Sequence, residues 1–147
     1  ASMTLLTSWH MLIGRAKIKP GQIVLVMGGS SGVGILGIQI AKLYGCTVIA
    51  TASPEKLQQL KELGADYTVD HRKEDWHKEV FKISKEIAKT KGDVTGIDVI
   101  FEHIGGSHFN KELTLLKYGA TMVTTGATTG YDVPADLRHI SLRELGT

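Results

Sequence analysis

The residues best suited to chemistry form one glycine-rich segment, Gly28-Gly29-Ser30-Ser31-Gly32-Val33-Gly34. An apolar run at 23–27, typical of a buried parallel strand, precedes it, and a helical pattern from Val33 to Tyr44 follows. Backbone N–H groups at the start of a helix have no partner within the helix, and the helix dipole attracts anions to that end. Glycine lets the backbone turn tightly and approach a ligand closely. The segment therefore predicts a phosphate-binding turn whose contacts are Gly29, Ser30, Ser31, Gly32, Val33 and Gly34.

The spacing of the glycines indicates which kind of phosphate ligand is bound. The dinucleotide pattern G-x-G-x-x-G matches residues 29–34 with one departure, because Ser31 stands at its second glycine. A triphosphate-binding loop would need Gly-Lys-Ser or Gly-Lys-Thr after the glycines, and the sequence has neither there. Tight packing without a ligand is the simpler alternative for a glycine-rich turn. Its position between a strand and a helix favours a dinucleotide.

The pattern of apolar and polar residues predicts the elements around this turn. Strands are expected at 23–27, 47–51, 66–69, 97–101 and 120–125, and helices at 33–44, 54–63, 109–116 and from Asp75 onward. Ser53 is expected to cap the second helix, and Gly45 and Gly64 are expected to end helices. Residues 1–13 carry no helix start signal. This alternation predicts an α/β fold, a doubly wound parallel sheet of about six strands with helices on both faces.

The end of the second predicted strand bears on the choice of dinucleotide. NAD-binding domains place a carboxylate there, about 20 residues beyond the loop, for the ribose hydroxyls. Here Thr51 holds that position and is expected to contact the cofactor in place of a carboxylate, and no carboxylate precedes Glu55. Hydroxyl and cationic groups that could hold a 2′-phosphate follow this strand and the next, namely Ser53, Lys56, His71 and Arg72. NADP(H) is therefore the predicted cofactor and NAD(H) the alternative, while solvated surface is the simpler interpretation of Lys56 and Arg72.

Composition limits the class of protein. With 147 residues and 42% hydrophobic residues, the chain suits one domain, residues 1–147. The net charge is +2, but the first 54 residues hold four basic residues and no acidic one, which suits an anionic ligand and is too sparse for nucleic acid. No signal peptide or membrane-spanning run is evident, so a cytoplasmic protein without a membrane partner is expected. Cys46 is the single cysteine, and the six histidines form no metal-ligand pattern.

With these features in place, the sequence resembles the cofactor-binding domain of the medium-chain dehydrogenase/reductase superfamily, closest to the quinone oxidoreductases related to zeta-crystallin and alcohol dehydrogenase-like members. Besides the loop, the resemblance rests on Lys19-Pro20-Gly21, Gln39-x-Ala41-Lys42, Lys56-Leu57, Leu63-Gly64-Ala65-Asp66, Gly96-x-Asp98 and Gly126-Ala127-Thr128-Thr129-Gly130. Each motif is weak alone, and their order and spacing carry the assignment. The resemblance implies a Rossmann fold and hydride transfer between a nicotinamide and a quinone, carbonyl or enone.

The resemblance also implies further cofactor contacts and a missing part. Gly105 and Gly106 after the fourth strand, with Thr125, Gly126, Ala127 and Thr128 after the fifth, would border the ribose and nicotinamide. The catalytic domain of such enzymes normally precedes the stretch that begins here. The chain is therefore expected to be a fragment of a two-domain oxidoreductase, with no catalytic residue of its own and inactive alone. Its expected partners are the cofactor and the missing catalytic domain, and a homodimer is an arrangement to test. A zinc ligand of some relatives would fall near Met3, so no metal is expected in this chain.

Two other functions fit parts of the pattern. A short-chain dehydrogenase would match Gly28, Gly32 and Gly34, but it needs a tyrosine followed four residues later by lysine, and no tyrosine here has one. A non-catalytic nucleotide-sensing or structural module of the same fold stays open, because an isolated cofactor domain could bind without turnover.

Overall fold

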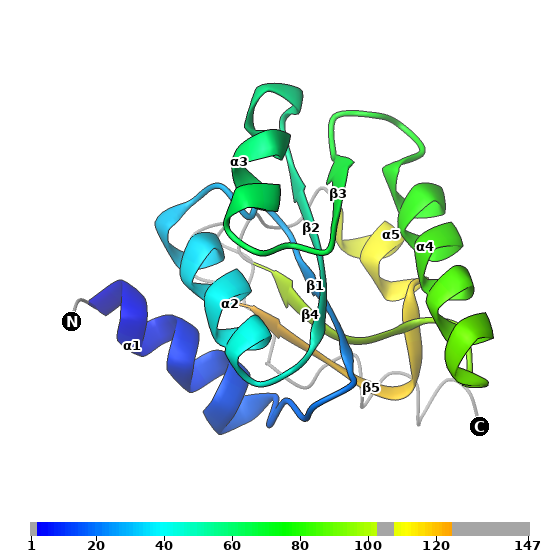
Figure 1. The fold of residues 1–147 in the computed structure, drawn as a ribbon, viewed down its shortest axis with the longest axis horizontal. Coiled ribbons are helices and arrows are strands. Elements are labelled where there is room, and N and C mark those ends of the chain that lie inside the picture. Colours follow the sequence, from blue (N-terminus) through cyan, green and yellow to red (C-terminus); the bar gives the residue numbers. More distant parts are fainter. Residues whose placement is uncertain (1–2, 103–107, 125–147) are drawn as a thin grey trace.

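A computed structural model describes residues 3–102 and 108–124, and a parallel β-sheet lies at its centre (Figure 1). The strands are β1 (Ile23–Val26), β2 (Thr47–Ala52), β3 (Tyr67–Asp70), β4 (Ile97–Glu102) and β5 (Leu116–Thr124). They lie in the order β3-β2-β1-β4-β5, and each neighbouring pair is parallel. The predicted doubly wound sheet is confirmed, and the described residues supply five of its expected strands.

Helices connect the strands, as the alternating pattern predicted. They are α2 (Gly32–Leu43), α3 (Leu57–Glu62), α4 (Trp76–Lys91) and α5 (Phe109–Leu113), with a 3-10 turn, η2 (Pro54–Lys56), before α3. Gly45 and Gly64 follow α2 and α3 with φ values of 81° and 116°, which confirms that they end these helices.

One predicted boundary was wrong. The helix expected over 109–116 ends at Leu113, and β5 begins at Leu116 instead of Ala120. The register of β4 against β5 shifts between Ile97 and Val99, and Gly119 in β5 has a φ of 81°. Such an irregularity interrupts the alternation of apolar and polar residues that is typical of a strand, so the sequence pattern did not predict a strand over residues 116–119.

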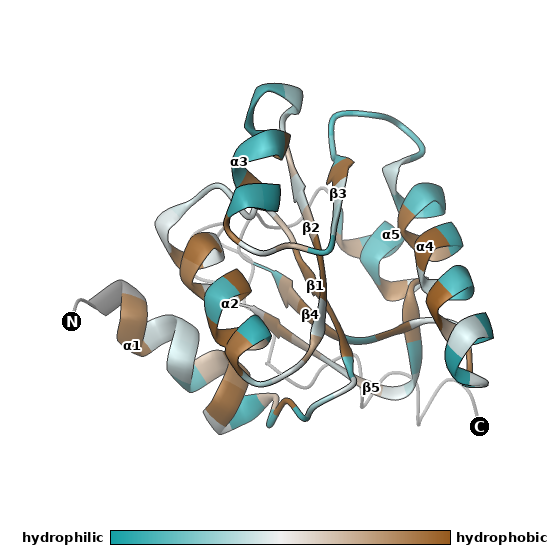
Figure 2. Ribbon diagram, viewed as in Figure 1, coloured by the Kyte–Doolittle hydropathy of each residue, from teal (hydrophilic) through white to brown (hydrophobic). Residues whose placement is uncertain are grey.

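Helices cover both faces of the sheet. Along β1, Val24 and Val26 belong to one hydrophobic cluster, while Ile23 and Leu25 belong to the other. The first cluster lies under α2 and α3, and the second lies under α4 and α5 (Figure 1). Figure 2 shows the apolar strands at the centre and hydrophilic residues on the outer sides of α3 and α4. Because β1 is buried on both faces, its sequence is a continuous apolar run.

A helix that the sequence pattern did not reveal precedes β1. This helix, α1 (Met3–Trp9), continues into a π-helical turn, η1 (His10–Arg15), and packs beside α2 (Figure 1). Ser8 is fully buried, and its hydroxyl donates a hydrogen bond to the carbonyl oxygen of Val33 in the first turn of α2 (3.0 Å). A buried polar residue interrupts the apolar periodicity between Leu5 and Leu12, which explains why the helix was missed.

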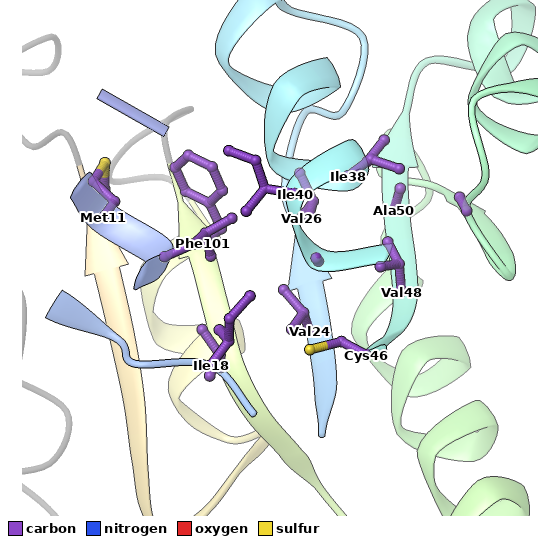
Figure 3. Close-up of a cluster of buried hydrophobic side chains, with 14 of the residues drawn as sticks. Met11, Ile18, Val24, Val26, Ile38, Ile40, Cys46, Val48, Ala50 and Phe101 are labelled. Atoms are coloured by element: carbon purple, nitrogen blue, oxygen red, sulfur yellow. The ribbon is translucent and has the colours of Figure 1, made fainter. Parts of the chain in front are cut away.

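Helix α2 approaches the sheet closely because residue 37 is glycine. A Cβ on Gly37 would lie 2.5 Å from the ring of Phe101 on β4. Phe101 is fully buried in the same cluster as Val26 and Ile40 (Figure 3). The position of α2, and therefore of its amino end, depends on this contact.

Two motifs of the family resemblance act as structural ties. Asp98 accepts a hydrogen bond from the N–H of Ile23 (2.8 Å) and pairs with Lys117 (3.1 Å), so it links β4 to the beginnings of β1 and β5. Asp66, before β3, pairs with Lys42 on α2 (2.9 Å). Among residues 3–102 and 108–124, no helix combines the length and apolar character needed to cross a membrane.

Candidate dinucleotide-binding site

The glycine-rich turn lies where the order of the strands reverses. The chain leaves β1 towards β2 on one side, and it later returns to the other side of β1 with β4. Connections that run in opposite directions leave a crevice outside the carboxyl ends of the two central strands. The turn at 28–31 directly follows β1 at this point. Ligands of doubly wound sheets bind at such switch points.

Backbone geometry explains why glycine occupies the turn. Gly28 has a φ of 72°, a left-handed conformation that strains other residues. A Cβ on Gly29 would lie 3.1 Å from Ile38 and 3.2 Å from Leu60. A Cβ on Gly34 would lie 2.5 Å from the carbonyl oxygen of Gly28. The first turn of α2 therefore packs against the backbone of the loop.

The amino end of α2 presents backbone donors. Ser31 is the N-cap residue, and its hydroxyl oxygen accepts a hydrogen bond from the N–H of Gly34 (3.0 Å). The N–H groups of Ser30, Gly32 and Val33 donate to no other residue that the structure describes. Such donors, at the positive end of the dipole of a 12-residue helix, form a site for an anion.

Thr51, which occupies the position where NAD-binding domains have a carboxylate, is fully buried. Its Oγ1 accepts a hydrogen bond from the N–H of Gly28 (3.1 Å), and its carbonyl oxygen accepts one from the N–H of Gly29 (2.7 Å). Oγ1 also lies 3.2 Å from Nδ1 of His71. The side chain thus contacts the loop and His71, because the carboxyl end of β2 lies beside the glycines.

The predicted residues after β2 and β3 lie at neighbouring strand ends. These two strands are paired, and the N–H of His71 donates to the carbonyl oxygen of Ala52 (3.2 Å). Arg72 pairs with Glu55 at 3.4 Å, and both side chains are about 60% exposed (62% and 60%). Lys56 is exposed beside Glu55. Two cations therefore face solvent at this edge, with one carboxylate between them.

Ser53 does not act as the helix cap that was predicted. It occupies the N-cap position of η2, but its side chain makes no capping hydrogen bond. A hydrogen bond from the backbone N–H of Glu55, then one from the Ser53 hydroxyl, lowers the pKa of Glu55, and the charge of Arg72 adds to this effect.

Three rings form a cluster beside Thr51 that sequence reasoning missed. The rings of His71 and His108 stack with centroids 5.9 Å apart, and Trp76 meets His108 edge-on at 5.4 Å. Burial, reinforced by the charge of Lys111, lowers the pKa of His108 and so favours its neutral ring. The residues come from the end of β3 and the beginnings of α4 and α5, so no local pattern could have revealed the cluster.

The residues predicted to border the ribose and nicotinamide are not among those that the structure describes. Gly105, Gly106, Thr125, Gly126, Ala127 and Thr128 lie outside the described residues. Within the described ranges, no group of three or more His, Cys, Asp or Glu side chains could hold a metal ion. The geometry therefore bears on the pyrophosphate and adenosine ends of the site.

A doubly wound parallel sheet with a glycine-rich turn at its switch point defines a class, the Rossmann-type nucleotide-binding domains. Residues 32–146 match the family described as zinc-binding dehydrogenase. The chain belongs to this family and is a cofactor-binding domain of the medium-chain dehydrogenase/reductase superfamily, as the sequence resemblance predicted.

The chain is similar to oxidoreductases with several activities. It is 36% identical over 122 residues to a quinone oxidoreductase of Pongo abelii, covering 82% of this chain and 35% of that protein. A crotonyl-CoA carboxylase/reductase of Cereibacter sphaeroides is 30% identical, with coverage of 97% and 37%. Two solved structures resemble the fold: an NAD-dependent alcohol dehydrogenase (TM-score 0.78, 37% identity, coverage 98% and 40%) and the CurK enoyl reductase (TM-score 0.72, 33% identity, coverage 83% and 34%). The chain thus spans between 34% and 40% of these relatives.

Proposed function

We propose that this chain is the NADP(H)-binding domain of an oxidoreductase that transfers hydride between the nicotinamide and a quinone, carbonyl or enone. The observation that carries the proposal is the group of N–H donors of Ser30, Gly32 and Val33 at the amino end of α2. A pyrophosphate accepts hydrogen bonds from such donors and is stabilised by the helix dipole. Relatives named quinone oxidoreductase, dehydrogenase and enoyl reductase support the reaction class.

Each part of the domain has a task in this proposal. The turn and α2 bind the pyrophosphate, and the ends of β2 and β3 bind the adenosine with its 2′-phosphate. When bound, the nicotinamide supplies the hydride. The protein orients the cofactor, and a catalytic domain outside this chain holds the substrate against it.

Exposed cations support NADP(H) over NAD(H). Lys56 and Arg72 lie at the neighbouring ends of β2 and β3, where a 2′-phosphate would need charge-assisted hydrogen bonds. The ion pair of Arg72 with Glu55 is exposed, and exposed pairs contribute little, so Arg72 can exchange Glu55 for a phosphate. NAD(H) stays the alternative, since one similar structure is that of an NAD-dependent alcohol dehydrogenase.

Calorimetric titration with NADPH and NADH tests the proposal. We expect the wild-type chain to bind both and to favour NADPH. Gly32→Glu places a carboxylate at the first residue of α2, where it suits the helix dipole but repels a pyrophosphate, and it should weaken both cofactors by at least about tenfold. Gln39→Glu, exposed on the same helix, adds the same charge away from the turn and should bind like the wild type. No binding by the wild type, or equal binding by Gly32→Glu, would contradict the proposal.

A second arm separates an oxidoreductase domain from a non-catalytic module. NADPH oxidation is followed with a panel of quinones and enones, using this chain and a longer chain that includes its flanking segments. We expect turnover only from the longer chain, because correct positioning of a substrate accounts for about 7–11 kcal/mol of a reaction barrier. Binding without turnover by either chain would favour the sensing or structural module.

A further inference from the structure

We propose that Thr51 is a positioning residue of the cofactor site, whose hydroxyl holds the glycine-rich turn in its binding geometry and joins it to His71. This inference rests on the proposed function. It goes beyond that function because it assigns a role in cofactor affinity to a side chain that does not touch the cofactor.

Thr51 holds the turn at two consecutive residues. The N–H of Gly28 donates to its Oγ1 (3.1 Å), and the N–H of Gly29 donates to its carbonyl oxygen (2.7 Å). The carbonyl contact needs no particular side chain, whereas the contact at Oγ1 needs a hydroxyl. The side chain is fully buried, so water does not compete for these bonds.

The Thr51 hydroxyl can donate its one proton to only one acceptor at a time, and the arrangement of its partners allows this. Oγ1 lies 3.2 Å from Nδ1 of His71 and 3.6 Å from Sδ of Met27. When Nδ1 of His71 lacks a proton, the hydroxyl donates to it. When Nδ1 carries a proton, His71 donates to Oγ1 and the hydroxyl donates to the sulfur of Met27. In both arrangements Oγ1 still accepts from Gly28.

A small shift of Gly28 would displace the backbone N–H donors at the amino end of α2. Gly28 is held in a left-handed conformation, and its carbonyl oxygen accepts a hydrogen bond from the N–H of Ser31 (3.2 Å). Ser31 in turn caps α2. Thr51 is thus connected through Gly28 and Ser31 to the first turn of α2, which carries the N–H groups of Gly32 and Val33. His71, on the other side of the hydroxyl, stacks on His108 at the adenosine end, so Thr51 lies between the two ends of the site.

The experiment compares Thr51→Val with Thr51→Ser. Valine keeps the shape of threonine without a hydroxyl, and serine keeps the hydroxyl. Thr47→Val is the matched control, because Thr47 is the first residue of the same strand, at the opposite end from Thr51. NADPH affinity is measured by calorimetry at a temperature where circular dichroism shows that all variants are folded. Hydrogen–deuterium exchange of residues 28–34 is measured without cofactor, as a readout of the turn itself.

We expect Thr51→Val to weaken NADPH binding by about tenfold, which corresponds to roughly 1.4 kcal/mol, and to speed exchange in 28–34. Thr51→Ser should restore both to near the wild-type values, and Thr47→Val should change neither. Wild-type affinity in Thr51→Val would overturn the positioning role while leaving the proposed function intact. A wild-type chain that binds no dinucleotide would overturn the proposed function and this role together.

A double-mutant cycle tests the link to His71. His71→Phe keeps a ring to stack on His108 and removes Nδ1. If the hydroxyl joins the two ends of the site, the loss of NADPH affinity in the double variant with Thr51→Val will be smaller than the sum of the two single losses. Additive losses would restrict the role of Thr51 to the turn.

Discussion

The residues of the candidate site fall into two groups: buried residues that contact the glycine-rich turn, and exposed residues at the ends of β2 and β3. Gly34 and Thr51 are buried and determine where the turn lies. Lys56 and Arg72 are exposed at the strand ends and are free to meet a ligand, apart from the weak pair with Glu55. Affinity for any dinucleotide should therefore depend on the first pair, and the choice between NADPH and NADH should depend on the second.

Replacing Lys56 tests this division. We expect Lys56→Gln to weaken NADPH binding by roughly tenfold, the loss of one charge-assisted hydrogen bond, and to leave NADH binding within about twofold. Lys82→Gln, on the exposed side of α4, removes the same charge elsewhere and should change neither affinity. Parallel calorimetric titrations with both cofactors provide the measurement. Equal losses for NADPH and NADH would show that Lys56 does not distinguish the 2′-phosphate.

At the scale of elements, partly buried and exposed charges join the beginnings of β4 and β5, at the end of the sheet opposite the site. Lys117 at the start of β5 pairs with Asp98 of β4 (3.1 Å) and with Asp93 before that strand (3.2 Å). Burial alone would lower the pKa of Lys117, but hydrogen bonds and charges from Asp98 and Asp93 outweigh it and raise the pKa. The folded protein therefore holds this proton more tightly than the unfolded chain does.

The sign of this shift predicts an alkaline effect. A group whose pKa is raised by folding contributes stability below its unfolded pKa, about 10.4 for lysine, and loses it as pH rises through the folded value. We expect the unfolding free energy of the wild type, relative to Lys117→Met, to be constant up to about pH 9 and to fall above about pH 10.4. Urea unfolding across this range measures it, with Lys82→Met as the control. If the difference in unfolding free energy between the wild type and Lys117→Met does not change with pH, the ion pairs with Asp93 and Asp98 do not raise the pKa of Lys117.

At the scale of the whole molecule, the single cysteine reports on opening of the core. Cys46 lies before β2 with 1% of its surface exposed, packed in the cluster shown in Figure 3, and its thiol donates to the carbonyl oxygen of Lys19 (3.3 Å). Burial raises the pKa of the Cys46 thiol, although the charge of Lys42 opposes this. Reaction of the thiolate therefore requires the domain to open.

Thiol reactivity should respond to the cofactor. We expect a chromogenic disulfide reagent to modify Cys46 at least about a hundredfold more slowly in the native protein than in urea. A ligand that binds only the folded state stabilises it, so NADPH should slow the reaction further when opening is global. Fast modification in native buffer would show that Cys46 is accessible without opening.

The sequence by itself determined the order of the elements from β1 onward, the sheet type and the presence of a glycine-rich turn between β1 and α2. These properties depend on local patterns: the apolar run of β1, the left-handed glycines that end α2 and α3, and the glycine-rich segment that joins a strand to a helix. The family resemblance was also carried by short motifs, although Asp66 and Asp98 in those motifs proved to have structural tasks.

Only the tertiary structure decided which candidate residues are exposed to solvent and which are buried in contact with the turn. Thr51 was predicted from its position to face the cofactor, but the packing of β2 beneath the turn directs its hydroxyl to Gly28 and His71. The stack of His71 on His108 and the packing of α1 against α2 also join segments that are distant in the sequence. Local patterns encode the conformation of a segment, whereas the direction and partners of a side chain depend on which segments pack together, so these contacts could be seen only in the folded chain.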